Sequence, residues 1–96
     1  MNAVSLDFSK IVDESTERIR PFIRKTYFMY SPAFSNITSA DVRFKMENLQ
    51  VTGSFKARGA VNKLLSLTKN ERQKGVVSAS TGNHGAAVAY AAQKLN

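Results

Sequence analysis

Lys56 lies at a position in the sequence that suits an amine nucleophile. Lys56 follows the short polar turn of residues 52–54 and begins a stretch whose apolar residues recur at helical spacing. These apolar residues are Ala57, Ala60, Val61, Leu64 and Leu65. We expect a helix over residues 54–68, with Ser54 as its N-cap and Lys56 in its first turn. Because the positive end of the helix dipole disfavours an ammonium ion there, the amine is placed to attack a carbonyl group and form a Schiff base.

A second polar loop could bind an anion. It follows a strand expected at residues 76–77 and precedes an alanine-rich helix expected over residues 86–95. The residues of the loop are Ser80, Thr81, Gly82, Asn83, His84 and Gly85. Free backbone N–H groups at a helix start, together with the two hydroxyls, suit a carboxylate or a phosphate. The loop matches neither the Walker phosphate loop nor the Gly-x-Gly-x-x-Gly dinucleotide motif.

Taken singly, these residues have ordinary explanations. A lone lysine is usually a solvated surface residue, and His84 alone more often makes a local hydrogen bond at a helix start than acts as a base. Ser80 and Thr81 are good capping residues, and Phe44 and Phe55 belong by default to the core. The joint occurrence of both loops, in this order and close together in the chain, is what favours a functional interpretation.

The composition narrows the kinds of site that the chain can hold. Its 96 residues include no cysteine and one histidine, which excludes disulfides and thiolate metal sites and argues against a dedicated metal centre. No segment has the length and apolarity of a membrane span, and the start lacks the apolar core of a secretory leader. We therefore expect a cytoplasmic chain, with no metal and no membrane partner, that is large enough for one small core.

The net charge of +7 makes an anionic partner a general possibility. The basic residues of the second half are Lys45, Lys56, Arg58, Lys63, Lys69, Arg72, Lys74 and Lys94. They are scattered along the chain, and no aromatic stacking platform is interleaved with them. A nucleic-acid-binding module is therefore a minor alternative, and we expect no nucleic-acid partner.

The first part of the chain predicts a helix followed by irregular structure. Apolar residues fit a helix over residues 7–24, which Pro21 should end or restart. Residues 26–41 lack sustained periodicity, so we expect irregular structure there, with a short strand near residues 27–30.

The remaining part predicts alternating strands and helices. Residues 42–47 alternate between apolar and charged side chains, which predicts a half-buried strand. The inner face of this strand would carry Val42, Phe44 and Met46. A turn over residues 48–53 leads into the Lys56 helix, and the polar residues 68–75 lead to the second strand. The order strand, helix, strand, helix predicts an α/β fold.

Two segments resemble the N-terminal signature of a known enzyme group. They are residues 45–60, which contain the Thr-Gly-Ser-Phe-Lys turn, and residues 80–85. Together they resemble the fold-type II pyridoxal-phosphate enzymes, which share a two-domain fold like that of tryptophan synthase β, and specifically the threonine/serine dehydratase (ammonia-lyase) and serine racemase group. The resemblance covers most of the chain, because residues 18–19 and 24–26 also match the family's opening helix and the turn before its first strand. Tyr27 stands where the family usually has proline.

The resemblance implies pyridoxal 5′-phosphate as the cofactor and an amino acid as the substrate. Lys56 would hold the cofactor as a Schiff base, Phe55 would pack against its pyridine ring, and Asn83 would hydrogen-bond its ring hydroxyl oxygen. The residues implied to hold the substrate carboxylate are Ser80, Thr81, Asn83 and His84. The freed Lys56 amine would remove the α-proton, and loss of the β-hydroxyl would lead to a 2-oxo acid and ammonia. Lys56 and Thr81 are the catalytic candidates.

The resemblance also changes the expected topology. A strand-helix-strand unit ordinarily forms one parallel sheet, but in this family the second strand begins a smaller domain. We therefore expect residues 1–74 to be the N-terminal part of the large cofactor-binding domain and residues 75–96 to be the start of the small domain. Neither would be complete, and no glycine-rich loop for the cofactor phosphate occurs in the sequence. We expect the isolated chain to bind the cofactor weakly and to be inactive, and the parent enzyme to be a homo-oligomer.

The residue at position 81 bears on the choice of reaction. Racemases of this group place a serine there as a second base, whereas many dehydratases have alanine. Thr81 has the hydroxyl but adds a methyl group. We favour dehydration and deamination of threonine or serine, with an amino-acid racemase or a related hydroxyamino-acid lyase as the alternative. A non-catalytic truncated product is a second alternative.

Overall fold

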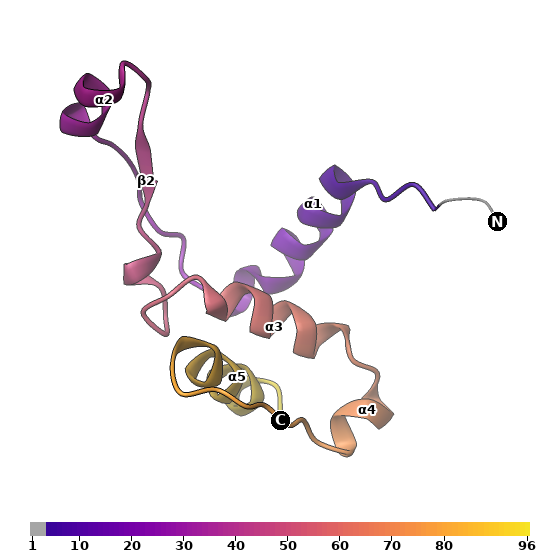
Figure 1. The fold of residues 1–96 in the computed structure, drawn as a ribbon. Helices are drawn as coiled ribbons and strands as arrows, with labels where there is room; N and C mark the ends of the chain where they lie inside the picture. The colour runs from indigo at the N-terminus through magenta and orange to yellow at the C-terminus, as the bar shows by residue number, and fades with distance from the viewer. Residues whose placement is uncertain (1–3) are drawn as a thin grey trace.

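The computed structural model describes residues 4–96, whose elements follow one another along an extended path (Figure 1). The helices, 3-10 turns (η) and strands are α1 (Phe8–Ile19), η1 (Arg20–Phe22), β1 (Phe28–Tyr30), α2 (Pro32–Thr38), β2 (Arg43–Lys45), η2 (Glu47–Leu49), α3 (Lys56–Ser66), α4 (Lys69–Gln73) and α5 (Asn83–Lys94). The chain is thus mixed α/β, as expected. None of the helices in this described part has the length and apolarity to cross a membrane.

The molecule is less compact than a closed domain of its length. Helix α3 packs against both α1 and α5, while β1, α2 and β2 form an arm that projects away from these helices (Figure 1). The Cα radius of gyration is 16.7 Å, whereas a compact domain of this size has about 12–13 Å. The apolar core is therefore formed mainly by the three helices.

Helix α1 begins and ends at signals that the sequence carries. The Asp7 side chain accepts a hydrogen bond from the Lys10 backbone N–H at 3.1 Å and caps the helix. The helix ends at Ile19, and Pro21 lies in η1 directly after it. The predicted break at Pro21 is therefore confirmed.

The core is small and lies where α3 packs against α5. Its buried apolar residues are Ile19, Ala60, Val61, Leu64, Ala87 and Ala91. Ala87 and Ala91 are one turn apart on the same face of α5 and are fully buried, so their short side chains allow a close approach of the two helices. The Tyr90 hydroxyl also donates a hydrogen bond to the Phe22 carbonyl, which fixes η1 to α5.

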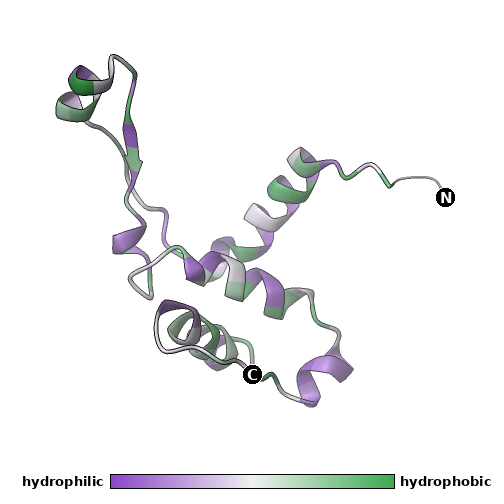
Figure 2. Ribbon diagram, in the orientation of Figure 1, coloured by the Kyte–Doolittle hydropathy of each residue, from purple (hydrophilic) through white to green (hydrophobic). Residues whose placement is uncertain are grey.

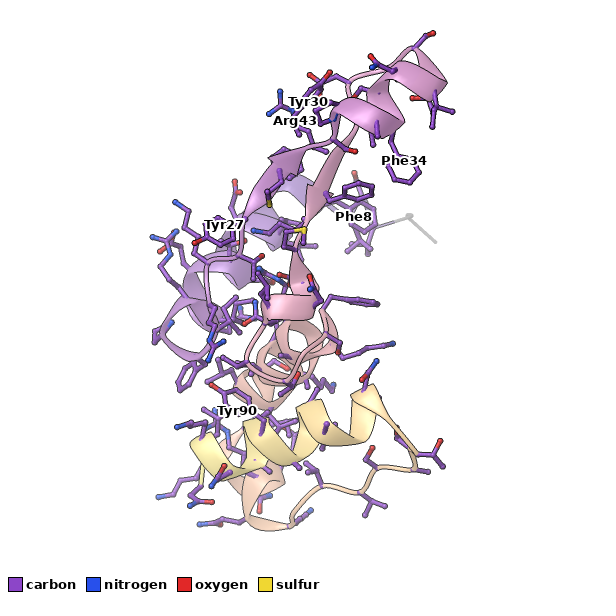
Figure 3. The ribbon with its side chains drawn as sticks, turned by 90° about the vertical axis from the view of Figure 1, so that its left-hand side faces the viewer. Phe8, Tyr27, Tyr30, Phe34, Arg43 and Tyr90 are labelled. Atoms are coloured by element: carbon purple, nitrogen blue, oxygen red, sulfur yellow. The ribbon has the colours of Figure 1, made fainter. Side chains whose placement is uncertain are left out.

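The arm contains an antiparallel strand pair whose side chains are largely exposed. Met29 of β1 lies opposite Phe44 of β2, so the strand predicted near residues 27–30 is confirmed and the second strand is found at residues 43–45. The predicted half-buried face is found at Val42 and Met46, which are half-buried, whereas Phe44 is 44% exposed and its ring packs edge-to-face against Phe34. Apolar residues at the tip of the arm are visible in Figure 2, and Figure 3 shows Phe34 and Tyr30 there.

Helix α2 lies inside the segment that was expected to be irregular. The Ser31 side chain caps it by accepting a hydrogen bond from the Phe34 N–H, and Pro32 occupies its first turn. It ends at Ser39, which has a left-handed φ of 54°. A helix of only two turns is too short to show hydrophobic periodicity, and the Ser-Pro pair was the available signal.

The strand predicted at residues 76–77 is wrong. Val77 is fully exposed, and no backbone hydrogen bond joins residues 76–79 to another described segment. A strand forms only beside a partner that accepts and donates its backbone hydrogen bonds, and residues 4–96 place none there. The alanine-rich helix after it is confirmed as α5, which begins at Asn83.

Helix α4 occupies part of the polar stretch that was expected to be a connection. The Thr68 hydroxyl accepts from the Glu71 N–H at 3.2 Å, and the Glu71 carboxylate accepts from the Thr68 N–H at 2.7 Å, which is a capping box. Arg72 donates to the Leu65 and Leu67 carbonyls at the end of α3. This short helix therefore fixes the direction in which the chain leaves α3.

Candidate active site

The turn before Lys56 is shaped by a glycine and a serine. Gly53 has a φ of +76°, a conformation that side-chain-bearing residues rarely adopt, and its N–H donates to the Gln50 carbonyl at 2.8 Å. The Ser54 hydroxyl is buried and accepts from the Lys56 N–H at 3.3 Å. Helix α3 begins at Lys56 rather than at residue 54, with Phe55 in the N-cap position. Lys56 is in the first turn, as predicted.

Gly53→Ala is expected to lower the free energy of unfolding by about 1 kcal/mol, because a Cβ disfavours the left-handed conformation. Urea denaturation followed by circular dichroism measures the change. Gly59→Ala is the matched control, since Gly59 lies inside α3 in open space without a positive φ. Alanine is the better helix former, so the control should be neutral or stabilising. Equal losses in both variants would contradict a conformational role for Gly53.

Lys56 opens onto a cavity that it shares with the start of α5. The cavity has a volume of about 330 Å³ and is lined by Phe55, Lys56, Gly59, Ala60, Lys63, Leu64, His84 and Val88. The Lys56 Nζ lies 5.2 Å from the centroid of the Phe55 ring. Within residues 4–96 no carboxylate is within ion-pair distance of Nζ. The structure thus brings Lys56, Phe55 and His84 together around one cavity. Within residues 4–96 the Lys56 amine forms no ion pair with a carboxylate.

The second loop folds over the beginning of α5. The Ser80 hydroxyl accepts from the Gly82 N–H at 3.2 Å. A Cβ on Gly85 would lie 3.3 Å from the Ser80 Cβ, which is a tight contact, so glycine at this position lets the loop pack on the helix. Gly82, at the N-cap, has no side-chain acceptor for the first-turn N–H groups of α5. Ser80, Thr81 and Asn83 lie at this exposed helix start and are not among the residues that line the cavity.

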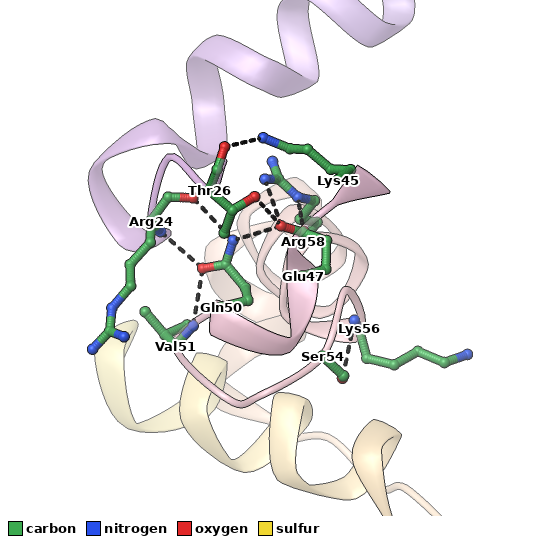
Figure 4. A network of polar contacts seen from close by, with 9 residues as sticks. All are labelled: Arg24, Thr26, Lys45, Glu47, Gln50, Val51, Ser54, Lys56 and Arg58. Carbon is green, nitrogen blue, oxygen red and sulfur yellow. Dashed lines mark hydrogen bonds and ion pairs between the residues drawn. The ribbon is translucent and has the colours of Figure 1, made fainter. Parts of the chain in front are cut away.

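A polar network that the sequence patterns did not predict lies on the other side of the turn (Figure 4). Arg58 donates from Nε and Nη2 to the two carboxylate oxygens of Glu47, the second contact being 3.2 Å. The same carboxylate accepts from the Thr26 hydroxyl at 2.6 Å and from the Gln50 amide at 3.4 Å. Gln50, only 3% exposed, also pairs with the backbone N–H and carbonyl of Arg24 at 2.8 and 2.9 Å. The network therefore joins the segment before β1, η2 and the first turn of α3.

The hydrogen bond from Arg58 is the main reason that the pKa of Glu47 falls from 4.5 to about 2. Burial opposes this shift, whereas the hydrogen bonds from Thr26 and Gln50 lower the pKa further. Because the folded pKa lies below the unfolded one, the group stabilises the fold above pH 4.5, and this contribution is lost as the pH falls towards 2.

At neutral pH, we expect the free energy of unfolding of wild type to be about 1–2 kcal/mol higher than that of the Glu47→Gln variant. This figure allows for the screening of the ion pair by solvent. The difference should shrink between pH 4.5 and pH 2. Urea denaturation of both proteins across this range measures it. A difference that does not depend on pH would contradict the lowered pKa.

The arrangement places a lysine beside an aromatic ring, on a cavity shared with a helix start that no side chain caps, and this combination suits amine chemistry. The sequence profile described as pyridoxal-phosphate dependent enzyme matches residues 19–96. The chain belongs to this family, whose members depend on pyridoxal phosphate, as the resemblance implied.

Individual relatives come from both branches of the group that the resemblance named. The chain is 46% identical over 82 residues to the L-threonine ammonia-lyase of Thermotoga maritima, covering 85% of this chain and 20% of that protein. It is 44% identical over 100 residues to a catabolic L-threonine dehydratase of Staphylococcus aureus, covering 98% of this chain and 29% of that protein. The crystal structure of serine racemase from Dictyostelium discoideum matches with a TM-score of 0.83 and 44% identity, covering 88% of this chain and 28% of that one. The chain thus spans less than a third of the length of each.

Proposed function

We propose that the chain is the lysine-bearing N-terminal segment of a pyridoxal-phosphate-dependent lyase. The reaction would be the dehydration and deamination of a β-hydroxy amino acid, threonine or serine, to a 2-oxo acid and ammonia. The observation that carries this proposal is the free Lys56 amine beside Phe55, on a cavity whose opposite wall begins at His84. The similarity to a threonine ammonia-lyase and a threonine dehydratase supports the choice of reaction.

The residues around the cavity suit pyridoxal phosphate. The Lys56 amine would bind the aldehyde carbon, and the Phe55 ring, already adjacent to that amine, would pack on the planar pyridine ring. When bound, the cofactor supplies a ring that accepts electron density from the α-carbon of the substrate. Asn83, the first residue of α5, would hydrogen-bond the ring hydroxyl oxygen. The buried Thr52 hydroxyl has no hydrogen-bond partner within residues 4–96.

Substrate binding would rely on the loop before α5. Ser80, Thr81, Asn83 and His84 would hold the substrate carboxylate through hydroxyls, side-chain donors and the uncapped N–H groups of the helix start. Lys56, once released, would take the proton from the α-carbon as a general base. Thr81 is the second catalytic candidate, since its hydroxyl could carry a proton.

The two walls of the cavity support a division into two domains. We propose that residues 1–74 belong to the large cofactor-binding domain and residues 75–96 to the start of the small one. Helix α3 contributes Lys56 from the first part and α5 contributes His84 from the second. Substrate and cofactor would then meet in the cleft between the domains.

Racemisation is the second candidate reaction, because Thr81 supplies a hydroxyl in the loop and a serine racemase is among the similar structures. The parent protein, purified with pyridoxal phosphate and given L-threonine or L-serine, should release a 2-oxo acid and ammonia. Chiral chromatography of the remaining amino acid tests the alternative. Predominant formation of D-serine with little 2-oxo acid would show that the protein is a racemase and not a lyase. If neither product formed, both proposed reactions would be contradicted.

The isolated 96-residue chain is proposed to bind the cofactor weakly and to turn over no substrate. Titration of the chain with pyridoxal phosphate, followed by visible absorbance, tests the first statement. A stable, stoichiometric band would contradict weak binding. Loss of that band in Lys56→Ala would still support the lysine assignment.

A further inference from the structure

The Glu47–Arg58 ion pair closes a loop around the candidate lysine. Glu47 begins η2 and Arg58 is the third residue of α3, so the pair joins the two ends of the segment that contains the turn and Lys56 (Figure 4). Arg58 uses two nitrogens on two carboxylate oxygens. Such a bidentate contact fixes the angle between the partners as well as their distance.

The rotation of α3 about its axis decides which way Lys56 points. A helix turns by about 100° per residue, so Lys56 and Arg58 leave α3 about 200° apart. Ala57, between them, is fully buried. Lys56 lines the cavity with His84, while Arg58 reaches Glu47 on the opposite side. A rotation that released Arg58 would therefore carry Lys56 away from its place at the cavity.

The carboxylate of the pair is itself held in place. Its other hydrogen bonds come from Thr26 and from Gln50, whose amide is in turn bound to both backbone groups of Arg24. The side chain of Glu47 is 14% exposed and that of Arg58 is 33% exposed, so solvent competes little for the carboxylate.

We propose that Glu47 and Arg58 are positioning residues that aim the Lys56 amine into the cavity it shares with His84. This inference rests on the proposed role of Lys56. It assigns a role to Glu47 and Arg58, neither of which lines the cavity that Lys56 shares with His84.

Reductive labelling of the whole 96-residue chain tests the proposal. The chain is incubated with excess pyridoxal phosphate, reduced with borohydride, and the label is assigned to individual lysines by peptide mapping. Wild type should carry most of the label on Lys56. In Glu47→Gln, which keeps the size of the side chain but offers its amide to Arg58, the share on Lys56 should fall about fivefold or more. Arg58→Gln, which has one amide donor group and adds no amine that could take label, should also lower the share on Lys56.

Glu71→Gln is the matched control. Glu71 is likewise a hydrogen-bonded carboxylate, which accepts from the Thr68 backbone N–H, but it stabilises α4 and forms no hydrogen bond with the first turn of α3. Its label distribution should equal that of wild type, with far-UV circular dichroism confirming that every variant is folded. An equal loss in Glu71→Gln, or an unchanged share in Glu47→Gln, would overturn the positioning role and leave the proposed function standing. Label spread evenly over the lysines of wild type would overturn the positioning role, whereas the proposed function stands or falls with the products that the parent protein forms.

Discussion

Lys56→Arg is expected to reduce formation of 2-oxo acid from L-threonine by the parent protein by about 10³-fold or more, since both covalent catalysis and the base would be lost. A guanidinium stays protonated at any working pH and cannot attack an aldehyde carbon, although it preserves the positive charge. In the isolated chain the same change should remove borohydride-fixed label from the peptide that contains position 56. Both readouts depend on the amine alone and not on the charge.

Lys63→Arg is the control for this result. Lys63 lies further along α3 and lines the same cavity, so it is a second amine facing the same hollow. The substitution should leave the label on Lys56 and change the rate little. If wild type instead carried its label mainly on Lys63, or if Lys56→Arg kept its activity, the assignment of the nucleophile would be wrong.

Ala87→Leu is expected to lower the free energy of unfolding by up to about 3 kcal/mol, the upper part of the range for overpacking a buried site. Ala87 is fully buried where α5 packs on α3, and a leucine there must push the helices apart. Because the two helices form the two walls of the cavity, the change should also reduce label at Lys56. Urea denaturation and peptide mapping measure the two effects on the same sample.

Ala89→Leu provides the comparison for Ala87→Leu. Ala89 lies two residues later in α5 and is exposed. Alanine and leucine have similar helix propensities, so the substitution should change stability by less than about 0.5 kcal/mol. A similar loss of stability in both variants would show that α5 does not pack on α3 through the face that carries Ala87 and Ala91.

The lysine and its turn were predictable from the sequence because their signals are local. A glycine and a serine before an apolar periodic stretch predict a helix start, and Lys56 lies in the first turn of α3. His84 was also predicted near a helix start, and it shares the cavity with Lys56. The pairing of Glu47 with Arg58 carries no such signal, since it depends on how the chain returns after the turn.

The parts of the fold that were predicted wrongly depend on contacts between distant segments. The strand at residues 76–77 requires a neighbouring strand, which residues 4–96 do not provide, whereas the strand at residues 43–45 has β1 as its partner. Helices α2 and α4 were missed because helices of 7 and 5 residues are too short to show a periodic pattern, although Ser31 and Thr68 carried capping signals. Local chemistry was therefore easier to predict than long-range pairing.

The unpaired segment at residues 76–79 has a consequence for the integrity of the site. It is part of the covalent link between the cavity wall that carries the Lys56 amine and the wall that begins at His84. Exposed chain without backbone hydrogen bonds is where proteases cut most readily. A single nick there would leave the two walls joined only by the packing of α5 on α3 and by the hydrogen bond from Tyr90 to Phe22.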